Sequence, residues 1–181
     1  MTGLGFALAL AAAAPATPQP APLSFDQRIL AAHNAERVRL GSKPLVWSPE
    51  LAAHARVWAE ELARKNMFEH APEKAGAPPE GENLWMGTAR AYSPEQMVGS
   101  WTGERPLYKP GKFPNVSTSG KWEDVGHYTQ LIWAKTTHIG CALVANRTDD
   151  YLVCRYSPPG NWIGEYALAP SVPLTKAQKR K

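Results

Sequence analysis

The stretch VGHYTQLIWAKTTHIGC, from Val125 to Cys141, brings together a histidine, a dense run of aromatic and aliphatic residues, a second histidine, a glycine and a cysteine. A small domain needs a hydrophobic core, an anchor and a site for chemistry, and this stretch can contribute to each of them. We therefore interpret the rest of the chain as what packs around these residues.

Two strand-like segments surround the only cysteines, Cys141 and Cys154. IGCALVA (139–145) and YLVCRY (151–156) are aliphatic and aromatic, and a polar turn of hairpin length separates them. Neighbouring strands would bring the two cysteines close enough to bond, which would stabilise the fold by about 3 kcal/mol. Two separate buried thiols are the alternative. Two cysteines alone cannot form a four-thiolate zinc site.

Three upstream segments have helical signals. The first has a loose helical period and stops before a glycine, and the other two begin at Ser-Pro-Glu, a typical N-cap followed by proline. They span about 25–40, 48–66 and 93–105. Between the second and third lies a loop rich in proline and glycine, 71–81, which ends on an acid, an amide and an aromatic. With the hairpin, these elements predict an α+β fold.

Composition and charge exclude some classes of function. The 181 residues are 44% hydrophobic, which suits one globular domain. Of 20 Lys and Arg residues, four lie in the last six positions, so 16 remain to balance 16 acidic residues. A neutral body lacks the basic stripe that nucleic-acid binding requires, so we predict no nucleic-acid partner. We interpret the basic tail, 169–181, as a solvated charge run, with contact to an anionic surface as the alternative.

The amino terminus predicts export. Residues 1–16 contain an uncharged apolar run that is too short to span a bilayer and a small-x-small cleavage site, Ala14-Pro15-Ala16. A buried or disordered alanine-rich terminus is the alternative. A Pro-rich linker, 17–24, follows. We expect a secreted protein, extracellular or periplasmic, with no transmembrane segment in the mature chain and a single domain over residues 25–168.

Four motifs, in order, resemble those of the CAP superfamily, which includes cysteine-rich secretory proteins, antigen 5 and pathogenesis-related class 1 proteins and is also called the SCP domain. They are HNAER (33–37), GENLW (81–85), GHYTQLIW (126–133) and YLVCRYSPPGNW (151–162). The resemblance implies an α-β-α sandwich with a three- or four-stranded antiparallel sheet between helical layers. It also implies a disulfide between Cys141 and Cys154. Ion-channel-blocking activities belong to family members with extensions that differ from this chain, and are not expected.

The resemblance further implies a cleft lined by two histidines and two acids. The matching positions are His70, Glu82, Glu104 and His127. Some family members bind zinc or another divalent ion through the two histidines, so His70 and His127 become the expected metal ligands and Zn²⁺, or another divalent cation, the expected cofactor. From spacing alone, each would be a structural histidine, because no helical pair of ligands fixes them.

The remaining polar residues receive structural interpretations. We interpret His33 as a structural histidine that hydrogen-bonds a neighbouring loop, and Asn34, Arg37 and Asn83 as scaffold that holds the loop carrying Glu82. His54, on a helix rich in charges, is expected to face solvent. His138, at the start of a strand, matches no site position.

Two functions remain open. One is a secreted protein that binds a lipid or sterol, or an extracellular or cell-surface partner. The alternative is a metal-assisted hydrolase or peptidase in which Glu82 or Glu104 acts as the base and a metal-bound water as the nucleophile. The sequence has no Gly-x-Ser-x-Gly elbow, and a disulfide-bonded cysteine is no nucleophile. We therefore favour binding over catalysis and leave enzymatic activity undecided.

Overall fold

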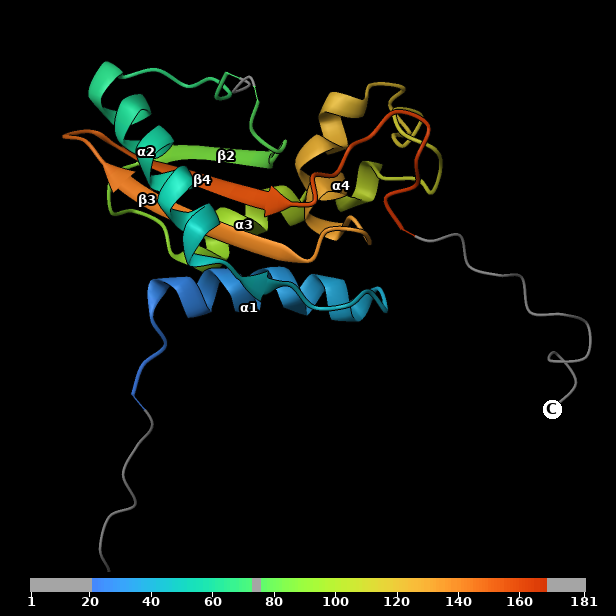
Figure 1. Cartoon of the computed structure of the whole chain (residues 1–181), viewed down its shortest axis with the longest axis horizontal. Coiled ribbons are helices and arrows are strands. Elements are labelled where there is room, and N and C mark those ends of the chain that lie inside the picture. The colour runs from blue at the N-terminus through green and yellow to red at the C-terminus, as the bar shows by residue number, and fades with distance from the viewer. Residues whose placement is uncertain (1–20, 73–75, 169–181) are drawn as a thin grey trace, which may run out of the picture.

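A computed structural model describes residues 21–72 and 76–168. The predicted signal peptide, the basic tail and half of the predicted linker lie outside the described residues. Within them, a four-stranded sheet has helices on both of its faces (Figure 1). The expected α-β-α sandwich is confirmed.

The elements follow the order α1 (Phe25–Arg39), β1 (Val46–Trp47), α2 (Pro49–Lys65), β2 (Gly81–Thr88), α3 (Pro94–Thr102), α4 (Gly126–Ile132), β3 (His138–Ala145) and β4 (Asp149–Ser157), with short 3-10 turns η1 (Arg105–Leu107) and η2 (Trp122–Val125). The predicted helix starts are confirmed. Ser48 accepts a hydrogen bond from the backbone of Leu51, and Ser93 accepts one from the backbone of Gln96.

The sheet is mixed, whereas the sequence predicted an antiparallel one. Its strand order is β1-β3-β4-β2, and β4 runs antiparallel to both of its neighbours. The short β1 pairs in parallel with β3, with Val46 opposite His138. Parallel neighbours need a long crossover, and here that crossover contains α2, β2, α3 and α4. No turn signal near β1 or β3 in the sequence predicts this parallel pair.

Strand β2 was not predicted from the sequence. The residues that follow the proline-rich loop continue as a strand that pairs with β4 along its full length, from Gly81 opposite Tyr156 to Thr88 opposite Asp149. Glycines at positions 81 and 87 weaken the strand signal, because glycine is depleted in strands. Glu82 therefore lies on a strand and not at the end of a loop.

Alternate residues of the strands build two separate hydrophobic cores. Cys141, Leu152 and Cys154 face the layer of α1, α3 and α4. Ala142 and Val153, their neighbours in the sequence, face α2. Figure 1 shows α2 crossing the front of the sheet, with α3 behind it.

The disulfide lies at the centre of the sheet. Cys141 and Cys154 are directly opposite in the β3–β4 register, with their Cα atoms 4.1 Å apart, and their sulfur atoms are bonded. The predicted disulfide is confirmed, and the alternative of two separate thiols is wrong. Residues 128–133, in the aromatic and aliphatic run of the stretch from Val125 to Cys141, pack in the core, because all six are buried.

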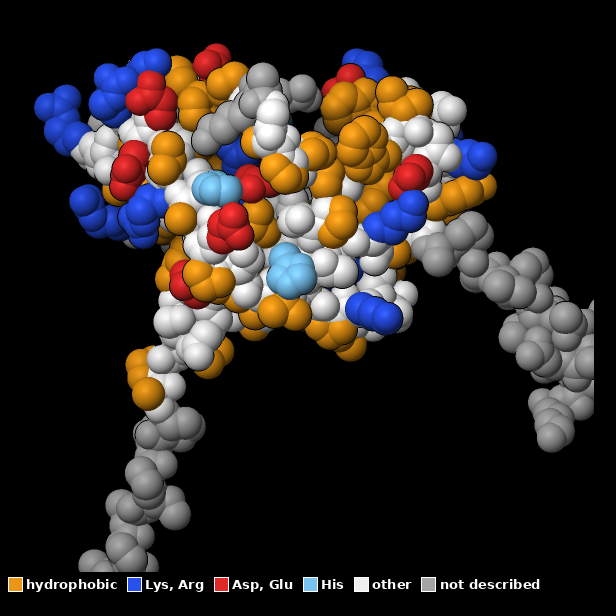
Figure 2. Space-filling view, in the orientation of Figure 1, with side chains coloured by type: hydrophobic (Ala, Val, Ile, Leu, Met, Phe, Trp, Pro, Cys, Tyr) orange, Lys and Arg blue, Asp and Glu red, His pale blue; other side chains and the backbone are white. Residues whose placement is uncertain are grey.

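The surface over α2 is covered by charges of both signs. Figure 2 shows basic and acidic side chains intermingled at this end of the molecule, and several form pairs within the helix, such as Arg64 with Glu61. Among residues 21–72 and 76–168, no helix has the length and apolar character needed to cross a bilayer.

Candidate functional site

The four candidate residues form two histidine–acid pairs. In the first pair, His70 meets Glu82 at the base of the long loop. His70 Nδ1 lies 2.6 Å from Glu82 Oε1, and the backbone N–H of Ala71 donates to the same oxygen at 3.1 Å. The Glu82 side chain is only 8% exposed, whereas that of His70 is 64% exposed. The buried carboxylate therefore holds an imidazole whose other edge faces outward.

The second pair forms where α4 begins. His127 Nδ1 lies 2.6 Å from Glu104 Oε1, and the backbone N–H of Tyr128 donates to Glu104 Oε2 at 2.9 Å. The His127 ring stacks on Trp101, with centroids 6.2 Å apart. The sequence predicted that Glu104 lies on the third helix, but α3 ends at Thr102 and Glu104 follows in the short connection to η1.

Both imidazoles are oriented in the same way. In each pair the nitrogen that meets the carboxylate is Nδ1, so Nδ1 carries the proton and donates it. The lone pair of each neutral ring is then on Nε2. A carboxylate bound to one ring nitrogen is the usual support for a histidine that binds metal through the other.

Two contacts bring β2 against α4 and so relate the two pairs. The side-chain amide of Asn83, next to Glu82 on β2, donates to the backbone carbonyl of His127 at 3.0 Å. A Cβ added to Gly81 would lie 2.2 Å from Gln130 Oε1, so the start of β2 packs directly on α4. A side chain at position 81 would have to displace the Gln130 amide.

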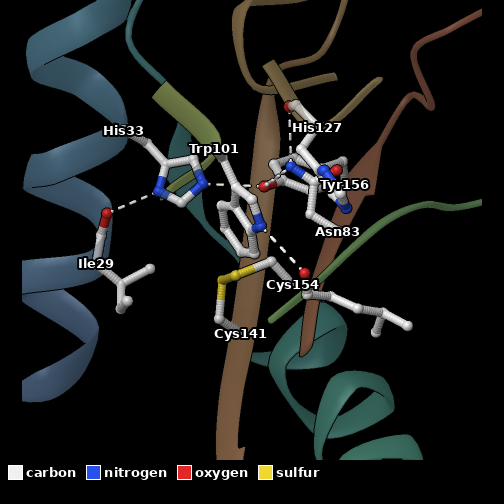
Figure 3. Close-up of a disulfide and its surroundings, with 9 residues drawn as sticks. Ile29, His33, Asn83, Trp101, His127, Cys141, Cys154 and Tyr156 are labelled. Carbon is white, nitrogen blue, oxygen red and sulfur yellow. Dashed lines mark hydrogen bonds between the residues drawn. A yellow bond between two sulfur atoms is a disulfide. The ribbon is translucent and has the colours of Figure 1, made fainter. Parts of the chain in front are cut away.

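A buried polar chain lies behind these contacts (Figure 3). His33 Nδ1 donates to the carbonyl of Ile29 at 2.8 Å, so its Nε2 accepts from the Tyr156 hydroxyl at 2.9 Å. That hydroxyl in turn accepts from the amide of Asn83 at 3.2 Å. Burial lowers the pKa of His33 to about 4 and raises that of Tyr156, so both are neutral near pH 7.

The four residues remain two pairs. Within the described ranges, no group of three or more His, Cys, Asp or Glu side chains could hold a metal ion together. In each pair the ring nitrogen left for another ligand is Nε2, on an imidazole that a carboxylate supports. Imidazole nitrogen of this kind is a ligand that zinc and similar divalent ions take.

Three residues around the first pair were not assigned to the site from the sequence. Arg155, on β4, lies opposite Glu82 in the sheet and places Nη2 2.8 Å from Glu82 Oε2. Its Nη1 lies 3.7 Å from Glu80, whose other oxygen meets His54 Nδ1 at 2.6 Å. The side chain of His54 is half exposed, as its position on a charged helix predicted, but it is also paired. The register of β2 against β4 places Arg155 opposite Glu82. The sequence could have indicated this neighbour only if β2 had been predicted.

The other scaffold residues do not support the loop before Glu82. Asn34 exchanges two hydrogen bonds with the backbone of Leu45 and so fixes the connection from α1 to β1. Arg37 is fully buried and donates to the carbonyls of Lys43, Leu131, Trp133 and Thr136. Burial lowers the pKa of Arg37 to about 10, so it stays charged at neutral pH. Only Asn83 has the predicted place beside Glu82. His138 is exposed at the start of β3, outside both pairs.

An α-β-α sandwich with one central disulfide and two carboxylate-bound histidines defines a class of small domain. Residues 30–156 match the family model described as the Cysteine-rich secretory protein family, CAP. The chain therefore belongs to the CAP family.

Plant proteins are among its relatives. The chain is 35% identical over 144 residues to the pathogenesis-related protein PR-1 of Medicago truncatula, covering 78% of each chain. It is 34% identical over 140 residues to the pathogenesis-related protein 1A of Nicotiana tabacum, covering 77% of this chain and 78% of the relative.

Solved structures agree with the fold. The crystal structure of NaASP2 with Zn²⁺ superposes with a TM-score of 0.64 at 26% identity, covering 78% of this chain and 83% of NaASP2. The structure of BmVAL-1 gives the same TM-score at 23% identity, covering 79% of this chain and 81% of BmVAL-1, and supports the fold alone.

Proposed function

We propose that this chain is a secreted CAP protein that binds a divalent cation, zinc or a similar ion, through Nε2 of His70 and Nε2 of His127. The observation that carries the proposal is the orientation of the two rings, since each gives Nδ1 to a carboxylate. NaASP2, a relative by fold, was solved with Zn²⁺. With two protein ligands, the ion is held more weakly than in a structural zinc site.

Binding is favoured over hydrolysis by the partners of the two acids. A general base needs a free carboxylate oxygen within reach of the proton that it removes. Glu82 is engaged by His70, Ala71 and Arg155, and Glu104 by His127 and Tyr128. Both acids serve to orient histidines.

Zinc titration tests the proposal. Equilibrium dialysis of the metal-stripped protein should show zinc binding near neutral pH, and the His70→Ala/His127→Ala double variant should lose it. His138→Ala is the matched control, because His138 is an exposed histidine outside both pairs, and it should bind as the wild type does. Equal zinc in the wild type and the double variant would remove the proposal.

Export is supported by the disulfide, since such bonds persist in oxidising compartments. The mature chain then begins after the predicted signal peptide. Expression of the full sequence in a secreting host, with mass analysis of the product, should show a chain shortened by about 16 residues, as the small-x-small site predicts. An intracellular product of full length would contradict export.

Lipid binding is the second candidate, and an exposed apolar loop favours it. Trp162 is 50% exposed and Ile163 is 82% exposed. Asn161 anchors this loop to the start of α4 by donating to the carbonyl of Gly126 and accepting from Thr129. The loop therefore presents apolar side chains from a fixed backbone beside the His127 pair, a surface suited to a sterol or acyl chain.

The lipid candidate has its own test. Uptake of a labelled sterol and of a labelled fatty acid should be measured for the wild type and for Trp162→Ser/Ile163→Ser. Val57→Ser is the control, because Val57 is 65% exposed on α2, away from that loop. Loss of uptake only in the double variant supports lipid binding, and no uptake by the wild type ends this candidate.

A further inference from the structure

The two His–Glu pairs differ in what holds their carboxylates. Glu104 uses one oxygen for His127 and the other for the backbone N–H of Tyr128. Glu82 uses Oε1 for both His70 and the N–H of Ala71, so its Oε2 is left for Arg155 alone. Among the described residues, no Lys or Arg pairs with Glu104.

The contact between Arg155 and Glu82 is an ion pair without a well-aligned hydrogen bond. Arg155 Nη2 is 2.8 Å from Glu82 Oε2, yet neither this oxygen nor Arg155 Nε has a hydrogen-bond partner in the part of the chain that is described. Both side chains are largely buried, at 15% and 8% exposure. Glu82 Oε2 is therefore held mainly by its electrostatic attraction to Arg155, in a position with little solvent.

Without Arg155, Glu82 Oε2 would be buried and unpaired, and the carboxylate would turn toward water, because burying an unpaired charge is costly. Rotation of the Glu82 carboxylate would move Oε1 away from His70. His70 is mostly exposed and, within the described residues, no other hydrogen bond holds its ring. Its orientation therefore depends on Glu82, whose Oε1 is held by the N–H of Ala71 and whose Oε2 is held by Arg155.

We propose that Arg155 is a positioning residue for the metal site: it fixes the Glu82 carboxylate so that His70 keeps Nδ1 protonated and presents Nε2 to the ion. This inference rests on the proposed metal-binding function. It assigns Arg155 no contact with the ion itself. The His127 pair, which has no arginine, does not depend on it.

Glu80 provides the matched control. It lies beside the same guanidinium at 3.7 Å, but its own Oε1 is already paired with His54. Glu80→Gln removes the longer contact and leaves the shorter one to Glu82. This variant should keep His70 in its wild-type form, whereas Arg155→Met should not.

The experiment measures the ring tautomers directly. Long-range ¹H–¹⁵N spectra of the metal-free protein, at about pH 8 and so above the usual histidine pKa of about 6.5, report which nitrogen carries the proton. In the wild type, His70 and His127 should both be Nδ1–H. In Arg155→Met, His70 should shift to a mixture rich in Nε2–H while His127 stays unchanged, which also shows that the variant is folded.

Zinc affinity is the second readout. Loss of a group that orients a ligand typically weakens metal binding about 10- to 100-fold, so Arg155→Met should weaken zinc binding by about that factor. Arg155→Lys keeps the charge without the planar fork and should give an intermediate loss. Glu80→Gln should bind as the wild type does.

The outcomes separate this inference from the proposed function. If His70 remains Nδ1–H in Arg155→Met, the positioning role is wrong, whatever the zinc affinity. If the tautomer shifts but the wild type binds no zinc, Arg155 positions His70 and the metal proposal fails. If Arg155→Met and Glu80→Gln behave alike, the shared guanidinium is not what fixes Glu82.

Discussion

The side-chain amide of Asn83 donates to the backbone carbonyl of His127 across 3.0 Å, and so joins strand β2 to the first turn of α4. The same amide also donates to the Tyr156 hydroxyl. Asn83 is 1% exposed, so neither acceptor would find bulk water in its place. One buried residue therefore connects the strand that carries Glu82 with the helix that carries His127.

Substitution of Asn83 should be costly. Asn83→Ala leaves one buried and one partly buried acceptor without their donor, and we expect the free energy of unfolding to fall by about 1–3 kcal/mol. Urea unfolding of the two proteins measures the difference. Asn115→Ala is the control, because Asn115 is exposed and should change stability by less than about 0.5 kcal/mol. Similar losses in both variants would show that the buried amide has no special role.

Stability should depend on pH through His33. Burial, aided by the nearby charge of Arg37, lowers its folded-state pKa to about 4, whereas the unfolded residue has a pKa of about 6.5. As the pH falls through this window, the unfolded chain takes up the proton first, so stability decreases by about 3 kcal/mol between pH 6.5 and 4. Above about pH 6.5 this contribution is constant.

Comparison with a variant that cannot titrate isolates the effect. Unfolding free energies of the wild type and His33→Gln, measured at intervals over that window, should differ in slope, with the variant flatter. His138→Gln removes an exposed histidine and should keep the wild-type slope. Parallel curves for the wild type and His33→Gln would contradict the assignment.

The disulfide should contribute a large part of the stability. Cys141 and Cys154 are 13 residues apart, and closing a loop of this size stabilises by about 3 kcal/mol in the chain-entropy model. The Cys141→Ala/Cys154→Ala double variant should unfold at correspondingly lower denaturant. Adding a reductant to the unfolding experiment should lower the denaturant midpoint of the wild type toward that of the variant. The midpoint of the variant should not change. A reductant-sensitive variant would point to some other cause.

Two glycines should respond to alanine in opposite ways. A Cβ on Gly140 would lie 2.1 Å from the backbone nitrogen of Ala52, so α2 would have to move off the sheet, at a cost of about 3 kcal/mol or more. A Cβ on Gly99, inside α3, would meet nothing within 4 Å. Gly99→Ala should therefore stabilise by about 0.5–1 kcal/mol. Thermal unfolding of both variants decides whether α2 packs this closely.

The sequence predicted the local features of the fold well. Ser-Pro-Glu starts, the polar turn of the hairpin and the facing cysteines are signals between near neighbours in the chain, and each is present in the structure. Strand β2 and the parallel β1–β3 pair were missed, because a glycine-rich strand and a long crossover leave no local trace.

The candidate site also contains residues that could be predicted from the sequence and one that could not. Family resemblance supplied His70, Glu82, Glu104 and His127, and the structure places each histidine against one of the acids. Arg155 had no signal of its own, since an isolated arginine on a strand is ordinary. Arg155 belongs to the site because it is paired with Glu82, and the two residues are neighbours only because β2 pairs with β4.

Arg37 has a consequence for the order in which this protein can be made. Its guanidinium lies at the amino-terminal end of the chain, yet three of its four carbonyl partners lie between 94 and 99 residues later. During translation, α1 leaves the ribosome long before those partners exist, and a charged group cannot enter the interior without them. The set of carbonyls around this buried charge is therefore complete only once residue 136 has been made, and a chain that ends before Thr136 lacks one of the partners of Arg37.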